Sequence, residues 1–268
     1  MAARNARPSC ADGLSLVFRV GEVPLSWLAG VSASVLVVAG AASADIATKP
    51  YCLHKGDGFR QLAFRAADGQ PLEGITVGRG RVGLVLGHMI GSDSCEWYDM
   101  AKVFARRGYR VLAIDFRGFG LSPPPVHHDQ TALWADIGGA AAEVRLLGAK
   151  RVVAIGSSMG GTAVVVAGAR PAYRLSGIIS ISGAGDFYGM DALAASRQVT
   201  IPAFFMAAHD DGSFPANARA MERRAQSKHK ALLILPGGTH GTPLLTEPDT
   251  ARRAQAFLFA ALHTIAAR

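Results

Sequence analysis

A serine, a pair of aspartates and a histidine each come a few residues after the end of a short apolar run in this sequence. Ser158 is the central residue of Gly-Ser-Ser-Met-Gly, and Asp210, Asp211 and His240 follow later runs. A serine hydroxyl is a poor nucleophile at neutral pH and needs a base within hydrogen-bond reach. Histidine can take that proton, and a carboxylate can hold the imidazole in the required tautomer. The pattern predicts nucleophilic catalysis by Ser158, with His240 as base and Asp211 as acid.

Other residues compete for the acid and base roles. Either aspartate of the pair Asp210 and Asp211 can instead cap a helix or shape a turn. Asp186 follows an earlier apolar run and is a remoter candidate for the acid. His209 stands immediately beside the two aspartates, where it cannot easily complete a triad with its own neighbours. We therefore favour Asp211 and His240.

Predicted strands and helices alternate along the chain, and they must position these residues. Continuous apolar runs are typical of strands buried on both faces, and they occur at 82–86, 110–114, 151–155, 178–181, 203–207 and 231–235. Helical spacing is found at 95–107, 133–147, 162–169, 215–225 and 251–266. Two shorter strands, at 59–65 and 75–77, come first and are joined by an Asp-Gly turn. This alternation predicts a mostly parallel, doubly wound sheet with helices on both faces, in which ligands bind at the carboxyl ends of the strands.

The segment around Ser158 has the composition of a sharp strand-to-helix turn. Small residues at Gly156 and Gly160 avoid clashes while the serine adopts a strained conformation that exposes its hydroxyl. The helix that follows directs free N–H groups and the positive end of its dipole toward the reacting centre. The backbone N–H of Met159 is therefore predicted to be one donor of an oxyanion hole. A second donor is expected in the loop 87–91, where His88 is expected to shape the loop.

Further stretches of the chain resemble the α/β-hydrolase superfamily. Residues 86–88, LGH, resemble the family's strand that ends in His-Gly, and residues 115–122, DFRGFGLS, resemble its D-x-R-G-x-G-x-S loop. With Ser158 in its turn and the pair of residues that begins at His240, the similarity extends from about residue 59 to the C-terminus. The resemblance implies a single-domain α/β-hydrolase fold with Ser158, Asp211 and His240 as its catalytic triad.

The same resemblance places the second oxyanion donor at Ile90. The family usually has glycine where this chain has Met89, so both Met89 and Ile90 are candidates for this donor. The family often inserts a cap domain between the strands at 178–181 and 203–207, but only the connection 182–202 lies there in this chain. The resemblance thus implies a small serine esterase without a large cap domain, or an enzyme similar to dienelactone hydrolases with serine in place of cysteine.

Apolar side chains on the strand-end loops are candidates for the walls of a substrate pocket. They are Met89, Phe187, Tyr188 and Phe214, while Trp97 is equally compatible with the pocket and with the core. The expected reaction is hydrolysis of a small-molecule carboxylic ester, or of a thioester, through an acyl-enzyme. An amidase or peptidase would use the same triad, and an exported binding protein can have the same fold without activity. The chemistry requires no cofactor, and no metal site is expected.

The first 44 residues are typical of an export signal. Three arginines precede the apolar run 25–40, and small residues at 42–44 follow it. We predict cleavage after Ala44, an N-terminal extension at 45–58, a hydrolase domain at 59–268, and a secreted or periplasmic location. An uncleaved membrane anchor and a buried helix are the alternatives. After cleavage two cysteines remain, Cys52 and Cys95, and they can form a disulfide or stay as thiols.

The formal net charge of +8 raises the question of an anionic partner. The lysines and arginines are scattered along the chain, and no stretch interleaves basic and aromatic residues. Nucleic-acid binding is therefore not expected, because clustering is the useful signal. Membrane contact is expected only if the N-terminal segment stays uncleaved. The sequence does not indicate an oligomeric state.

Overall fold

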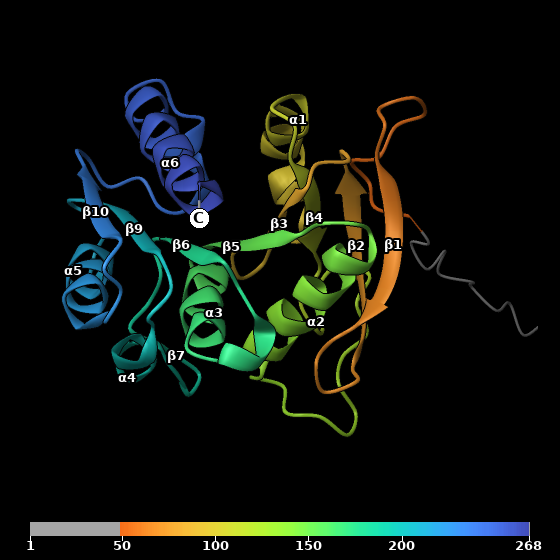
Figure 1. Ribbon diagram of the computed structural model, residues 1–268, viewed down its shortest axis with the longest axis horizontal. Helices are drawn as coiled ribbons and strands as arrows, with labels where there is room; N and C mark the ends of the chain where they lie inside the picture. The colour runs from red at the N-terminus through yellow and green to blue at the C-terminus, as the bar shows by residue number, and fades with distance from the viewer. Residues whose placement is uncertain (1–48, 268) are drawn as a thin grey trace, which may run out of the picture. The chain divides into compact units, whose positions relative to one another are not determined.

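An eight-stranded sheet runs through the centre of the protein (Figure 1). The computed structural model describes residues 49–267. The strands of the sheet are β1 (Arg60–Arg65), β2 (Pro71–Val77), β3 (Val82–Gly87), β4 (Arg110–Ile114), β5 (Arg151–Ser157), β6 (Gly177–Ile181), β9 (Ala203–Ala208) and β10 (Lys230–Leu235). Their order is β1-β2-β4-β3-β5-β6-β9-β10. Strand β2 is antiparallel to β1 and β4, and the other neighbouring pairs are parallel. The carboxyl ends of the parallel strands therefore meet at one edge.

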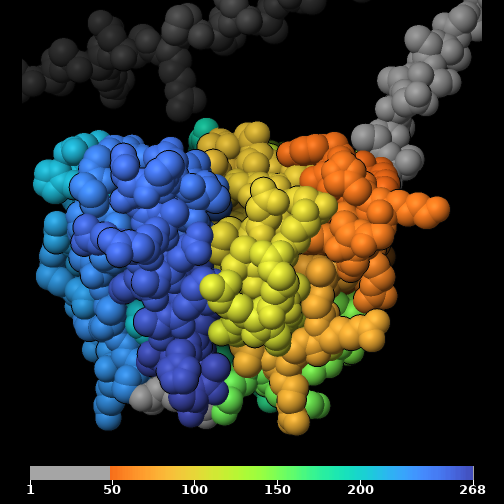
Figure 2. Space-filling view, turned by 90° about the horizontal axis from the view of Figure 1, so that it is seen from above, coloured from red at the N-terminus to blue at the C-terminus, as the bar shows by residue number. Residues whose placement is uncertain are grey.

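Helices cover both faces of this sheet. One face carries α2 (Leu133–Leu146), α3 (Met159–Gly168) and α5 (Phe214–Arg224), and the other carries α1 (Tyr98–Arg106) and α6 (Ala251–Ala266) (Figure 1). Figure 2 looks onto the second face and shows α1, in yellow, beside α6, in blue. Their aromatic rings meet there, with the centroids of Phe104 and Phe259 5.8 Å apart. Two apolar clusters thus bury the sheet from both sides.

The observed strands confirm the predicted mostly parallel sheet. Every residue of β6 and β9 is buried, as expected of strands covered on both faces. Strand β2 begins at Pro71, four residues before the predicted strand at 75–77, and contains Gly74. A Cβ on Gly74 would lie 2.5 Å from the carbonyl oxygen of Ala113 on β4. The glycine that weakens the strand pattern is thus needed for close approach of the neighbouring strand.

Two helix boundaries differ from the prediction. The segment predicted as a helix at 95–107 begins with a 3₁₀ helix, η1 (Ser94–Trp97), because the Asp93 carboxylate accepts the N–H of Cys95 and caps a separate turn. Helix α3 begins at Met159 rather than at residue 162, so it starts immediately after Ser158. Two further 3₁₀ helices are η2 (Pro171–Tyr173) and η4 (Thr242–Leu245).

The connection between β6 and β9 holds only short elements. They are the hairpin of β7 (Asp186–Phe187) and β8 (Met190–Asp191), then α4 (Ala192–Ala195) and η3 (Ser196–Gln198). No large cap domain occurs in this connection, as the sequence implied.

Cys52 and Cys95 form a disulfide, which decides between the two alternatives left open by the sequence. The described residues belong to one compact unit, Asp45–Arg268. The predicted export signal at 1–44 lies outside the described residues. Among the residues that are described, no helix is both long enough and apolar enough to cross a membrane.

Candidate active site

Ser158 lies on the sharp turn between β5 and α3, with φ of 52° and ψ of −114°. Residues other than glycine rarely adopt positive φ, so the turn is strained. The N–H of Ser158 donates to the carbonyl of Ile181, at 2.8 Å, which ties the turn to β6. A Cβ on Gly156 would clash with the backbone of Gly160, and a Cβ on Gly160 would clash with Gly87. The backbone therefore has the strained, closely packed form that the sequence predicts.

Asp211 and His240 form a hydrogen-bonded pair at the same edge of the sheet. Nδ1 of His240 lies 2.9 Å from both carboxylate oxygens of Asp211. A carboxylate only accepts, so Nδ1 carries the hydrogen and Nε2 is left as the basic nitrogen. The side chain of Asp211 is nearly buried, that of His240 is 33% exposed, and the ring of Phe214 packs on the imidazole at 4.3 Å between centroids. This hydrogen bond fixes the tautomer that a catalytic base requires.

Ser182 connects these two segments. It directly follows β6, and its Oγ donates to Oδ2 of Asp211 at 2.9 Å and accepts the N–H of Gly241 at 3.1 Å. The preceding residue, Ile181, accepts the N–H of Ser158. One short segment thus contacts the serine turn, the acid and the loop after the histidine. Sequence reasoning missed Ser182, although its place at the end of a predicted strand is the signal that identified the other residues.

The competing acid and base candidates lie in other surroundings. His209 pairs with its neighbour Asp210 at 2.6 Å, and both side chains are mostly exposed. Asp186 is exposed in the β7–β8 hairpin, where it accepts the N–H of Gly189. These contacts are local turn interactions. The hydrogen bonds between Asp211 and His240 instead favour these two residues as the acid and the base.

Two backbone N–H groups were expected to form the oxyanion hole. Met159 is the first residue of α3, and the first N–H groups of a helix have no acceptor within it. In the loop after β3, the N–H of Met89 donates to Oε2 of Glu96 at 2.8 Å. Met89 was one of the two candidates for the second donor, and that expectation is wrong because a carboxylate already occupies its N–H. The adjacent Ile90, which is 51% exposed, is the remaining candidate.

Glu96 is a second residue that sequence reasoning missed. It lies on η1 beneath the loop after β3, and burial raises its pKa to about 6 although hydrogen bonds from Met89, Thr242 and Ser92 lower it. Its Oε1 is buried and has no hydrogen-bond partner among the described residues. The carboxylate thus contacts both the loop after β3 and the segment just after His240. No sequence signal pointed to Glu96, because a single glutamate near the start of a helix is ordinary.

His88 shapes the loop after β3, as the sequence predicted. Its Nε2 accepts the N–H of Phe116 at 3.1 Å, so the ring's hydrogen is on Nδ1, which donates to the carbonyl of Met89 at 2.6 Å. Burial lowers the pKa of His88 to about 4. A fully buried neutral imidazole therefore joins the loops after β3 and β4 and has no role as a second base.

A small cavity of about 100 Å³ lies between the candidate oxyanion residues and the β7–β8 hairpin. Ile90 and Met159 line it on one side, and Phe187 and Tyr188, two predicted pocket residues, line it on another. Drug-sized ligands occupy cavities of about 300–1,000 Å³. The cavity, whose wall includes Met159 next to Ser158, therefore fits a small apolar group.

The other predicted pocket residues do not line this cavity. The sulfur of Met89 packs against Gly241, where an added Cβ would clash with it, and Phe214 covers the ring of His240. Trp97 is fully buried in the core. Among residues 49–267, no group of three or more His, Cys, Asp or Glu is arranged to hold a metal ion.

Comparison with known proteins agrees with this architecture. The sequence profile described as "alpha/beta hydrolase fold" matches residues 83–197. An esterase of Pyrococcus furiosus superposes with a TM-score of 0.62 at 15% identity, over 75% of this chain and 92% of that one. The α/β hydrolase GrgF from a Penicillium species superposes with a TM-score of 0.64 at 15% identity, over 77% and 97% of the two chains. The protein has the α/β-hydrolase fold.

A thermophilic esterase of Thermogutta terrifontis has the same fold, with a TM-score of 0.60 at 17% identity over 77% of this chain and 99% of that one. No curated protein sequence matches the chain significantly. In α/β-hydrolase folds the nucleophile, acid and base follow separate strands in the chain order Ser, Asp or Glu, His. Here Ser158 follows β5, Asp211 follows β9 and His240 follows β10.

Proposed function

We propose that this protein is a serine hydrolase that cleaves a carboxylic ester, with Ser158, His240 and Asp211 as its catalytic triad. One observation carries the proposal. A serine held at positive φ at the end of β5 lies at the same sheet edge as a histidine that is hydrogen-bonded to a nearly buried aspartate. Strain of this kind persists only where the surrounding structure imposes it, and it is common at active sites.

The proposed reaction proceeds through an acyl-enzyme. Nε2 of His240 takes the proton of Ser158 as Oγ attacks the carbonyl carbon, and Asp211 stabilises the charged imidazole. The N–H groups of Met159 and Ile90 donate to the oxyanion of the tetrahedral intermediate. When the C–O bond breaks, His240 returns the proton to the leaving alcohol. Water then attacks the acyl-enzyme by the same steps and regenerates Ser158.

The cavity supports a substrate with a short apolar acyl group. Its walls are largely apolar side chains and its volume is about 100 Å³, so an acyl group of a few carbons fits between Met159 and Phe187. A thioester has the same acyl part and is included in the proposal. The short β6–β9 connection agrees with a small esterase, because the described residues provide no large cap over Ser158.

A fluorophosphonate probe tests the proposal on the full chain. We expect covalent labelling at Ser158, mapped by mass spectrometry, and hydrolysis of an activated short-chain ester. Ser158→Ala and His240→Ala should each lower kcat at least a thousandfold, because members of a triad act as a unit. His209→Ala is the matched control, since it removes an exposed histidine paired with the neighbouring aspartate.

The outcome can also contradict the proposal. If folded protein is neither labelled nor active, the fold serves binding instead of catalysis. If amides or peptides are cleaved faster than esters, the triad stands and the substrate class is wrong.

We also propose export, with cleavage after Ala44. The disulfide between Cys52 and Cys95 supports this location, because disulfides persist in oxidising compartments. N-terminal sequencing of protein recovered outside the cytoplasm should begin at Asp45. A mature chain that begins at Met1 and stays with the membrane would instead support the uncleaved anchor.

A further inference from the structure

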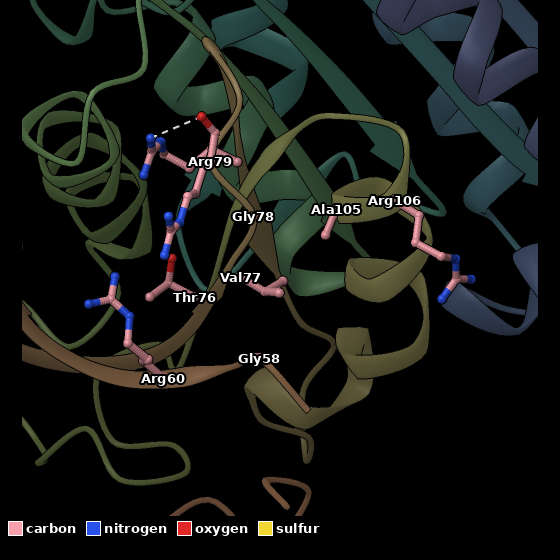
Figure 3. A pocket seen from close by; sticks show the side chains of 9 residues that line it. Gly58, Arg60, Thr76, Val77, Gly78, Arg79, Ala105 and Arg106 are labelled. Atoms are coloured by element: carbon pink, nitrogen blue, oxygen red, sulfur yellow. Dashed lines mark hydrogen bonds between the residues drawn. The ribbon is translucent and has the colours of Figure 1, made fainter. Parts of the chain in front are cut away.

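A cavity of about 750 Å³ lies far from the candidate active site, where β2 ends and β4 begins. The active-site residues follow the carboxyl ends of the parallel strands, so this cavity is at the opposite edge of the sheet. Four of its nine lining residues are arginines, and none is acidic. Figure 3 shows that the side chains of Arg60 and Arg79 extend to the same side of β2, whereas Arg106 points away from them.

The turn that carries Arg79 is held rigidly. Its sequence from residue 78 to 81 is Gly-Arg-Gly-Arg. A Cβ on Gly78 would clash with the carbonyl of Tyr109, and a Cβ on Gly80 would clash with Gly108. The glycines thus pack against the connection between α1 and β4, and the arginines that alternate with them are exposed.

Arg110 fixes the turn from the other side. Its Nε donates to the carbonyl of Gly80 at 3.3 Å, and its Nη2 donates to the carbonyl of Arg79 at 3.2 Å. A guanidinium has five N–H donors, so these two bonds hold Arg110 in place and leave donors for another acceptor. The guanidinium of Arg110 is therefore held beside the turn, and the exposed side chain of Arg79 and that of Arg60 line the same cavity.

These positive charges have no counterion within the described residues. Between residues 49 and 267, no carboxylate lies within 4.0 Å of the side chains of Arg60, Arg79 or Arg110. Arg117 shows the opposite arrangement, since it is buried and paired with Asp136 and Asp68.

Helix dipoles explain only one of the arginines in the cavity wall. Arg106 is in the last turn of α1, where a cation offsets the negative end of the helix dipole. Arg60 and Arg79 belong to a strand and a turn, so no helix end accounts for them. Several cations gathered without a partner repel one another, and a bound anion removes this repulsion.

We propose that this cavity binds the phosphate group of an anionic ligand through Arg60, Arg79 and Arg110. Guanidinium groups bind phosphate oxygens in a bidentate manner, which suits several arginines around one centre. A volume of 750 Å³ exceeds a single phosphate ion, so the ligand carries its phosphate on a larger body. This site is independent of the proposed hydrolase activity.

A second cavity extends the positive surface along the same edge. It has a volume of about 360 Å³ and is lined by Arg81, Val82, Lys150 and Arg151. The N–H of Lys150 donates to the carbonyl of Arg81 at 2.7 Å, so the second cavity begins where the Gly-Arg-Gly-Arg turn ends. A ligand that reaches beyond the first cavity therefore meets further cations.

The test compares two charge-matched double variants of the full chain at low ionic strength. Titration calorimetry measures binding of pyrophosphate, and cosedimentation measures binding to phosphatidylglycerol vesicles against phosphatidylcholine vesicles. We expect Arg60→Ala with Arg79→Ala to weaken binding at least tenfold. Arg219→Ala with Arg252→Ala removes the same charge from exposed positions on α5 and α6 and should leave binding within twofold.

A double variant with lysine at both positions separates the effect of side-chain geometry on binding from the effect of charge. Arg60→Lys with Arg79→Lys keeps the charge but loses the bidentate fork, and we expect binding between that of the parent and that of the alanine pair. Saturable pyrophosphate binding that depends on the arginines identifies a soluble phosphate ligand, and binding to anionic vesicles alone identifies a lipid headgroup. The proposal is overturned if neither probe binds the parent, or if both alanine pairs weaken binding equally. Unchanged circular dichroism confirms folding of each variant.

Discussion

Ser182 contacts both the acid and the loop of the base, and its own backbone has φ of 47°. Alanine at this position removes the hydroxyl and keeps the strained φ, whereas glycine removes the hydroxyl and relieves the strain. We expect both variants to lower kcat about tenfold with little change in KM, because the Asp211 carboxylate loses one hydrogen bond. Only Ser182→Ala should also lose stability, by about 1 kcal/mol.

Ester kinetics and urea unfolding measure the two effects separately. Equal kcat in the parent and in Ser182→Gly would mean that the hydroxyl does not position Asp211.

Two buried groups near the site give opposite dependences of stability on pH. Burial lowers the pKa of His88 from 6.5 to about 4, so the unfolded state binds the proton first and stability falls as pH drops from 6.5 to 4. Burial raises the pKa of Glu96 from 4.5 to about 6, so the folded state binds the proton first and stability rises as pH drops from 6 to 4.5. Between pH 6 and 4.5 the two effects oppose each other.

Glu96→Gln should make the stability of the protein more sensitive to acid, because protonation of Glu96 no longer offsets the effect of His88. The amide can still accept the N–H of Met89, but it does not titrate. Between pH 6 and 4.5 the variant should lose about 2 kcal/mol more of its free energy of unfolding than the parent does. Urea unfolding at several pH values measures this difference. Parallel curves for the two proteins would show that Glu96 titrates at its ordinary pKa.

The residues of the proposed triad could be selected from the sequence because each follows its own apolar strand. It does not identify the acceptor that occupies the Met89 N–H, since Glu96 reaches that group only through the tertiary fold. The pairing of the two cysteines was likewise undecided, because spacing along the chain does not show whether their Cα atoms come close enough to be bridged.

At the scale of elements, the β7–β8 hairpin forms one wall of the small cavity. Phe187 and Tyr188 stand together there, with ring centroids 4.7 Å apart. Phe187→Ala should enlarge the cavity and raise the ratio of kcat/KM for an octanoate ester over a butyrate ester at least fivefold, which is within the effect of a methylene or two in an apolar pocket.

A series of p-nitrophenyl esters measures the change in chain-length preference. Tyr51→Ala is the control, because Tyr51 is an exposed aromatic side chain that does not line the cavity. If both variants keep the parent's preference, the acyl group binds elsewhere.

Strands buried on both faces were predictable, since their apolar runs are continuous. The first residues of α1 and α3 were not predictable from the sequence. The side chain of Asp93 caps the start of η1, which precedes α1, and α3 starts directly after the strained Ser158, three residues before its predicted beginning. Both boundaries depend on single hydrogen bonds or dihedral angles, which hydrophobic periodicity does not report.

At the scale of the whole molecule, the disulfide joins the segment before β1 to η1, across a sequence separation of 43 residues. The loop that it closes holds β1, β2 and β3. We expect Cys52→Ser with Cys95→Ser to lower the free energy of unfolding by about 2–4 kcal/mol, because the crosslink restricts the unfolded chain. Urea unfolding of the oxidised parent and of the variant measures the loss. A difference below about 0.5 kcal/mol would mean that native contacts already hold residues 49–58.

The fold also changes how the distribution of basic residues is interpreted. Basic residues that are scattered in the sequence come together where β2 ends and where β4 and β5 begin. A search for local runs of charge cannot find this grouping, because it is produced by the strand order. The expectation that this chain does not bind nucleic acid rested on the absence of linear clusters of basic residues.

The order of the strands also has a consequence for synthesis. Strand β3 pairs with β4 on one edge and with β5 on the other, and β5 leaves the ribosome only after all of α2 has been made. During that interval an apolar strand has an open edge, which can pair with other nascent chains. Chains that stop before residue 151 should therefore aggregate, and a chaperone that holds this segment extended would protect the growing polypeptide.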